Sequence, residues 1–138
     1  MGKINFLKIA GAGLAGTTAM TVLVLAGPLM GLSMPGPWES LASFMRVPVA
    51  LGWIAHLMVG VVLALVYATL VRPHLRGAPW LRGALFAVAP WLMAQVVLMP
   101  MMGAGLFAGS AIVAIGSLMG HLVYGGVVGA TYGSPQAA

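Results

Sequence analysis

Residues 56–67 read HLMVGVVLALVY, and residues 121–132 read HLVYGGVVGATY. Both stretches follow the pattern H-L-x-x-G-x-V-x-x-x-x-Y, and they begin 65 positions apart. On a helix, with about 100° between residues, the histidine, glycine and tyrosine of each copy fall within roughly 60° of one another. Each helix therefore presents one face with an imidazole, a missing side chain and a phenol. These residues are His56, Gly60 and Tyr67 in the first copy and His121, Gly125 and Tyr132 in the second.

The composition indicates an all-α integral membrane protein. Of the 138 residues, 62% are hydrophobic and 5% are charged, and the mean hydropathy is +1.09. A soluble domain carries far more charge than this. The apolar runs are continuous and do not alternate with a period of two, which favours helices over the strands of a membrane barrel. A span needs about 20 residues, and we expect four transmembrane helices at about residues 9–32, 49–71, 83–102 and 106–132.

The connections between these runs predict the orientation. The segment at about residues 37–47 opposes apolar side chains to Glu39, Ser43 and Arg46, so we expect a short interfacial helix on the outer membrane surface. Five of the six lysines and arginines flank the opposite ends of the spans, and cytoplasmic loops are rich in such residues. We therefore expect a multi-pass membrane protein with both termini in the cytoplasm. The same rule explains the net charge of +5, so no nucleic-acid partner is expected.

The repeated pattern predicts the arrangement of the helices. Two spans separate the copies, so corresponding helices point the same way in a parallel repeat, with a pseudo-two-fold axis along the membrane normal. The simplest architecture is one domain, residues 1–138, in which a duplicated helical hairpin forms a four-helix bundle. Glycines at GxxxG spacing let helix backbones approach closely. We expect helix-packing roles for Gly60, Gly116, Gly120, Gly125 and Gly129, and for Tyr67 and Tyr132 near the inner interface.

Three segments resemble a known family. They read GWIAH at residues 52–56, LMPMMGAG at residues 98–105 and MGHLVYGGVVGATYG at residues 119–133. They look like a group of small four-span prokaryotic membrane proteins that is catalogued as a domain of unknown function. The resemblance covers roughly residues 49–133 and implies a four-helix prokaryotic membrane fold. A place in the prokaryotic inner (plasma) membrane is also what this resemblance implies. Some relatives are associated with terminal-oxidase gene clusters, which implies a place beside respiratory enzymes, but no activity and no catalytic residues come with it.

Two interpretations of His56 and His121 are open at this point. In the first, each neutral imidazole bonds a carbonyl or hydroxyl group of an adjacent helix, and the glycine one turn later admits that helix. In the second, the two histidines are the axial ligands of one b-type haem. Both imidazoles would then point inward at matched depth, with room for a porphyrin edge beside each glycine. The cofactor expectation is none, with haem b as the alternative.

The methionines give a third interpretation. The chain has eleven, and five of them gather at the outer ends of the first and third spans. Thioether and imidazole ligands suit Cu(I), although methionine also fills apolar packing. Copper handling or small-solute transport is therefore a further alternative. The five residues are Met30, Met34, Met99, Met101 and Met102.

The sequence favours a protein without an active site of its own. It has no cysteine and a single acidic residue, Glu39, so thiolate sites and paired carboxylates are excluded. It also has no Walker loop and no HExxH motif. We expect a small, non-catalytic accessory subunit or assembly partner of a larger membrane complex, with a respiratory terminal oxidase as the host implied by the resemblance. Its partners would be the lipid bilayer and either other membrane-protein subunits or a second copy of the chain, through small-residue faces of the first and fourth spans.

Overall fold

The computed structural model describes residues 4–133, and no strand occurs among them. Four helical segments in this range are long and apolar enough to cross a membrane. This confirms the all-helical class and the number of candidate spans expected from the composition. The four segments are Phe6–Met30, Val49–His74, Pro79–Met101 and Ala111–Tyr132.

Three of the four spans change pitch near one end, where an α-helix passes into a 3₁₀ or π turn. A turn of this kind redirects the last residues of a helix. In α4, Pro90 cannot donate a backbone hydrogen bond, and the chain becomes π-helical four residues later. The elements in chain order are α1 (Phe6–Ala26), η1 (Gly27–Met30), α2 (Pro37–Met45), α3 (Val49–Val66), η2 (Tyr67–Val71), η3 (Arg72–His74), α4 (Pro79–Met93), η4 (Ala94–Leu98), α5 (Met99–Met101), η5 (Leu106–Gly109) and α6 (Ala111–Tyr132).

The helix boundaries follow local capping signals. The last span begins at Ala111 instead of near residue 106, because Phe107 and Ala108 have φ values of 53° and 54°. A continuous right-handed helix does not contain such residues. Ser110 then caps α6, since its hydroxyl oxygen accepts a hydrogen bond from the Val113 N–H at 3.4 Å. The first span begins at Phe6, three residues early, because the Asn5 side chain caps α1 in the same way.

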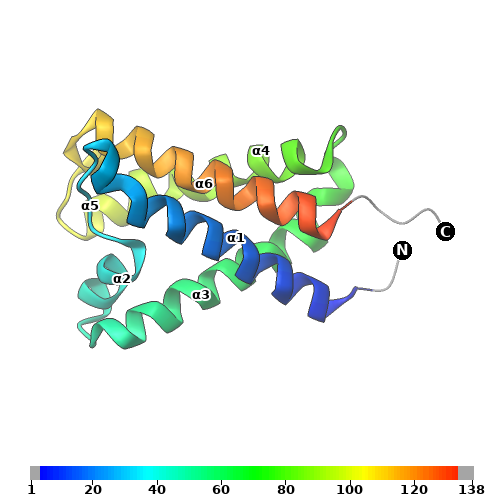
Figure 1. The fold of residues 1–138 in the computed structure, drawn as a ribbon, viewed down its shortest axis with the longest axis horizontal. Helices are drawn as coiled ribbons and strands as arrows, with labels where there is room; N and C mark the ends of the chain where they lie inside the picture. Colours follow the sequence, from blue (N-terminus) through cyan, green and yellow to red (C-terminus); the bar gives the residue numbers. More distant parts are fainter. Residues whose placement is uncertain (1–3, 134–138) are drawn as a thin grey trace.

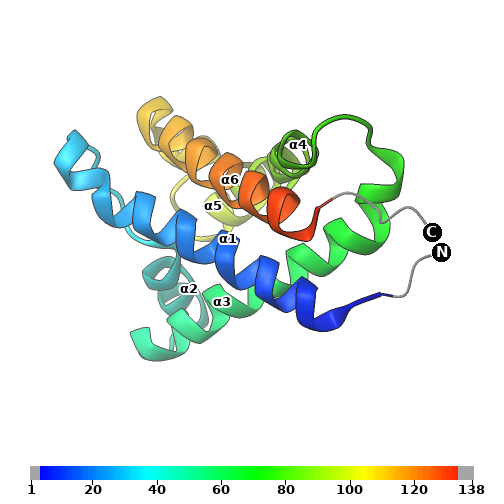
Figure 2. The same ribbon diagram turned by 45° about the vertical axis from the view of Figure 1, so that its right-hand side comes forward.

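The long helices form a chain of neighbours in the order α3, α1, α6 and α4. Helix α1 packs against both α3 and α6, α4 packs against α6, and the short helix α2 covers part of α3. Figures 1 and 2 show α1 lying between α3 and α6 in both views. The described ends of the chain and the loop at residues 72–78 lie at one end of the molecule, whereas α2 and α5 lie at the other (Figure 1). We call these the basic end and the α2 end.

Glycines set the distance between the paired helices. In the α4–α6 pair, a Cβ atom on Gly125 would collide with the Gly83 carbonyl oxygen and lie 2.6 Å from the Ala87 Cβ. In the α1–α3 pair, a Cβ atom on Gly13 would lie 2.7 Å from the Val61 Cα. Both distances are shorter than van der Waals contact, so only glycine permits these crossings.

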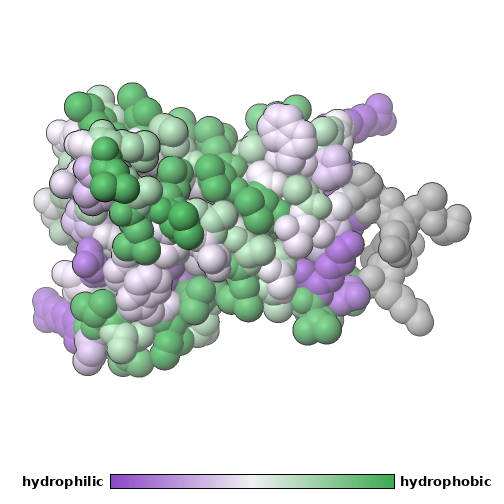
Figure 3. Space-filling model, in the orientation of Figure 1, coloured by the Kyte–Doolittle hydropathy of each residue, from purple (hydrophilic) through white to green (hydrophobic). Residues whose placement is uncertain are grey.

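The interior holds few large side chains because the backbones lie so close together. Ile9, Tyr67 and Val128 are almost fully buried between the helices, together with several alanines. Most large apolar side chains point outward, and Figure 3 shows hydrophobic residues over the middle of the visible face with hydrophilic residues toward its two ends. This distribution is typical of helices that meet lipid rather than water.

Replacing Gly125 with alanine should destabilise the α4–α6 pair. The new methyl group would collide with the Gly83 carbonyl group, and overpacking of this kind costs about 1–3 kcal/mol of unfolding free energy. Gly126 provides the matched control, because a Cβ atom there has only one neighbour, 3.9 Å away. We expect Gly126→Ala to leave the stability unchanged or to raise it slightly, since alanine favours helix. Denaturation in mild detergent, followed by circular dichroism, measures both; equal stability of the two variants would contradict the crossing.

Candidate functional site

His56 lies in a closed setting built by three helices. Its side chain is only 6% exposed, and its Nε2 atom lies 3.1 Å from the Thr21 hydroxyl oxygen on α1. The Trp38 ring on α2 lies 5.8 Å from the imidazole, between ring centroids, and the Trp53 ring on α3 lies 6.3 Å from it. The two indoles stack on each other at 4.1 Å with 9° between their planes. One imidazole thus ties α1, α2 and α3 together, and we call these four residues the His56 cluster.

Short-range features of the sequence place the indoles. Trp53 precedes His56 by three residues, so both side chains lie on one face of α3. Helix α2 approaches that face because a Cβ atom on Gly52 would collide with the Trp38 carbonyl oxygen. The start of α2 is fixed by Glu39, whose carboxylate accepts a hydrogen bond of 2.9 Å from the Gly36 N–H. The single acidic residue of the chain therefore caps a helix.

His121 has a different setting from its counterpart in the first copy. Its Nδ1–H donates a hydrogen bond of 2.8 Å to the Ser117 carbonyl oxygen one turn earlier in α6, so this bond joins no second helix. His121 is also partly exposed. His56 and His121 share no hydrogen bond and no ring contact in the described part of the chain. The two imidazoles therefore do not form one site by direct contact.

Neighbouring helices occupy the space beside both motif glycines. A Cβ atom on Gly60 would collide with the Thr17 hydroxyl group of α1, and one on Gly125 would collide with α4. The Gly60 carbonyl oxygen also accepts a hydrogen bond of 2.5 Å from the Tyr124 hydroxyl group of α6. The space beside each histidine that a porphyrin edge would need is thus occupied by protein.

The remaining predicted packing residues also lie at contacts. Tyr67 is fully buried, with its ring centroid 5.4 Å from that of Phe86, and Tyr132 is 8% exposed. Both tyrosines lie between helices rather than on the surface as anchors. On α6, Gly116 and Gly120 face methionine side chains, Gly129 faces the start of α4 and Gly125 faces its middle.

A second polar group joins α6 to the end of α4. The Gln95 Nε2 atom donates a hydrogen bond of 3.2 Å to the Ser117 hydroxyl oxygen. One turn earlier, the Trp91 indole N–H donates a bond of 3.1 Å to the Ala114 carbonyl oxygen. Gln95 is 2% exposed, and its Oε1 atom has no partner among residues 4–133. These polar side chains act as cross-links between spans.

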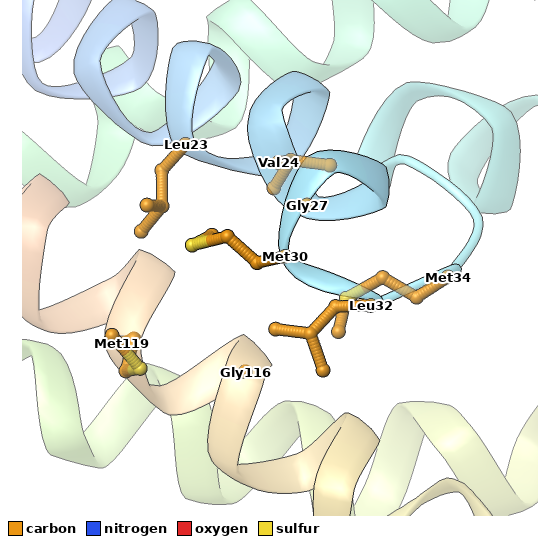
Figure 4. A pocket seen from close by; sticks show the side chains of 8 residues that line it. All are labelled: Leu23, Val24, Gly27, Met30, Leu32, Met34, Gly116 and Met119. Carbon is orange, nitrogen blue, oxygen red and sulfur yellow. The ribbon is translucent and has the colours of Figure 1, made fainter.

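The methionines expected to form one cluster are divided in the structure. Met30 and Met34 line a cavity of about 30 Å³ between η1 and α6, together with Met119. Figure 4 shows Met30 extending from η1 toward Leu23 across this space. Met101 and Met102 instead line a hollow with Ser43, Phe44 and Arg46. A cavity of 30 Å³ holds about one or two waters.

The family model of DUF6789, a family of unknown function, matches residues 5–137. The chain belongs to this family. No curated protein matches the chain, and neither does any solved structure. For this DUF6789 member, the site residues are therefore assigned from their own geometry.

The chemistry within reach of these DUF6789 residues is limited. No group of three or more histidine, cysteine, aspartate or glutamate side chains close enough to hold a metal ion occurs in residues 4–133. Four residues that the sequence did not indicate as site residues also contact His56 or Gly60. They are Thr21, Trp38, Trp53 and Tyr124. Trp53 could have been found from its i, i+3 spacing to His56; the others depend on tertiary contacts. The arrangement orients helices and presents no convergent set of reactive groups.

Thr21→Val should lower the unfolding free energy by about 0.6–2 kcal/mol, the range for hydrogen bonds between membrane helices. Valine keeps the shape of threonine but cannot bond the His56 ring. The matched control is Thr18→Val, because the Thr18 hydroxyl group donates to the Leu14 carbonyl oxygen of its own helix. Denaturation in detergent, followed by tryptophan fluorescence, compares the variants. If Thr18→Val costs as much as Thr21→Val, the inter-helix bond has no special role.

Proposed function

We propose that this protein is a non-catalytic, multi-pass membrane protein that works as a small accessory subunit or assembly partner of a larger membrane complex. The observation that carries the proposal is the use of its intramembrane polar side chains. His56, Gln95 and Tyr124 each bond a neighbouring helix, and no group of side chains that could hold a metal ion occurs in residues 4–133. Side chains arranged in this way fix the angles between spans, which is what a scaffold requires.

The outer faces of α3 and α4 are where a partner would dock. Among the long helices, α3 packs mainly on α1. Its outer face carries a stripe of exposed apolar residues one turn apart, Ile54, Met58 and Val62. Helix α4 likewise packs mainly on α6 and leaves Met93 exposed. These apolar faces suit lipid as well as a partner, so they give the place where a larger complex would dock.

The small-residue faces of α1 and α6 offer a partner less free surface than the sequence predicted. Helices of the same chain already pack against these faces, at Gly13 and Gly16 of α1 and at Gly125 and Gly129 of α6. Gly11, by contrast, has nothing within 4 Å of a Cβ atom. Docking would therefore use the larger apolar side chains of α3 and α4.

The proposal includes a duplicated hairpin and an orientation. The equivalent glycines Gly60 and Gly125 both contact the preceding long helix, α1 and α4 respectively, as a duplication of one hairpin requires. Lys8 in the first turn of α1, Arg72 in η3 and Arg82 in the first turn of α4 belong to the basic end. Their position supports an inner-membrane orientation with both termini in the cytoplasm. A respiratory terminal oxidase is the host we propose, on the family resemblance.

A photoreactive phenylalanine analogue at Met58 or at Met93 should form protein adducts in native membranes. The residues replaced are 61% exposed on α3 and α4. We expect an adduct with a different membrane protein from at least one position after irradiation, and none in the dark. Mass spectrometry of the adduct identifies the partner. An adduct of twice the mass of the chain would show a homodimer instead, and cross-linking to lipid alone at both positions would exclude the subunit role.

The haem and copper alternatives can be tested on one preparation from native membranes. We expect a flat reduced-minus-oxidised visible spectrum, because protein fills the space beside both motif glycines. We also expect no stoichiometric copper, since the outer methionines are divided between two places. A b-type haem band lost in both His56→Ala and His121→Ala would make the protein an electron carrier. Copper lost in Met30→Leu but retained in Met58→Leu would make it a copper-handling protein.

A further inference from the structure

Cations from three segments gather at the basic end. The Arg72 guanidinium carbon lies 4.6 Å from the centroid of the Tyr132 ring, and the Lys8 Nζ atom lies 5.5 Å from it. The Arg82 side chain reaches the carbonyl group of Leu75, three residues after Arg72. Helix α1, the turn η3 and helix α4 thus bring three positive charges to one end of the molecule.

Polar atoms of this group are buried without a partner. Arg82 is 5% exposed, and its one hydrogen bond is a long contact of 3.4 Å from a terminal nitrogen to the Leu75 carbonyl oxygen. The Nε atoms of Arg82 and Arg72 are buried and make no hydrogen bond with residues 4–133. A buried charge without a counter-charge is strongly unfavourable. Two guanidinium groups are thus left without a counter-charge among residues 4–133.

No carboxylate side chain of the protein can supply this negative charge. Glu39 is the only acidic residue in the sequence, and it caps α2 at the other end of the molecule. A second copy of the chain has the same lack of acidic side chains. Among residues 4–133, no side chain near this group therefore supplies the counter-charge.

We propose that Lys8, Arg72 and Arg82 form a binding site for the phosphate group of an anionic phospholipid. Lysine and arginine donors suit phosphate oxygens, and guanidinium groups bind them in pairs of parallel hydrogen bonds. Basic sites between helices on the cytoplasmic side recognise such headgroups. The inference needs the chain to span a membrane, but it does not depend on a protein partner.

The surroundings of the site fit a lipid better than a soluble anion. Trp80, which favours the depth of headgroups, is exposed in the same segment as Arg82. Exposed apolar side chains lie next to the cations in the sequence and could contact the acyl chains. They are Leu7, beside Lys8; Leu70, two residues before Arg72; and Leu81, beside Arg82.

Native mass spectrometry of the full chain in mild detergent tests the proposal. The probes are dioleoyl phosphatidylglycerol, dioleoyl phosphatidylcholine and inorganic phosphate. We expect one phosphatidylglycerol to be retained preferentially, phosphatidylcholine to bind at least about tenfold more weakly, and phosphate not to displace the lipid. Arg82→Gln and Arg72→Gln should each weaken phosphatidylglycerol binding by about tenfold or more, as expected when one partner of a buried charge contact is removed.

Arg76→Gln is the matched control, because it removes the same charge from an exposed position in the same loop. We expect it to bind phosphatidylglycerol as the original chain does. Arg72→Gln changes a half-buried position, so it tests the site should Arg82→Gln fail to fold.

Three results would overturn the proposal. Equal retention of the two lipids would show that no anionic headgroup is recognised. Equal loss of binding in Arg76→Gln and Arg82→Gln would show a diffuse surface charge instead of a site. Binding of inorganic phosphate in place of the lipid would assign the site to a soluble anion. None of these results bears on the cross-linking that tests the subunit role.

Discussion

The contact of helix backbones at glycine is the constraint on which the rest of the structure depends. In a lipid environment, apolar side chains gain little by leaving the solvent, so helices associate through close packing and hydrogen bonds. The crossings at Gly13 and Gly60 and at Gly83 and Gly125 bring the paired backbones together. Because α6 also lies close to α1, the Tyr124 hydroxyl group can reach the Gly60 carbonyl oxygen on α3. Larger residues at these crossings would separate the helices and break that bond.

The polar side chains then determine which geometry the packed helices adopt. A bond between membrane helices contributes only about 0.6 kcal/mol on average, so the single bonds of His56 and Gln95 add little stability. Their value lies in direction, since each can be made at only one rotation of its helix. The aromatic stack of Trp38 on Trp53 adds a similar constraint between α2 and α3. Together they define one arrangement among many that the apolar surfaces alone would allow.

The sequence predicts the all-helical class and the four helices long and apolar enough to cross a membrane, because both depend on composition and on length along the chain. Glycine spacing indicated Gly60 and Gly125 at the crossings, but it did not indicate their partners Gly13 and Gly83. The His56 cluster could not be predicted, because Trp38 reaches it from a separate helix that packs where Gly52 leaves room. The repeat predicts a similar depth for His121, but within the repeated helix the shift of 65 positions takes Trp53 to Leu118. His121 thus has no indole three residues before it, and it bonds its own helix.

The basic end shows a similar limit of reasoning from charge alone. The positive-inside rule concerns which side of the membrane a cation reaches, and an exposed residue such as Arg76 satisfies it fully. It does not require Arg82 to be buried with an unpaired Nε atom. Burial of a guanidinium group in a protein with one acidic residue has a cost that orientation does not explain. In the orientation that we propose, the anionic headgroups of the cytoplasmic leaflet would lie at the depth where the helices end, and they would provide the counter-charge that removes this cost.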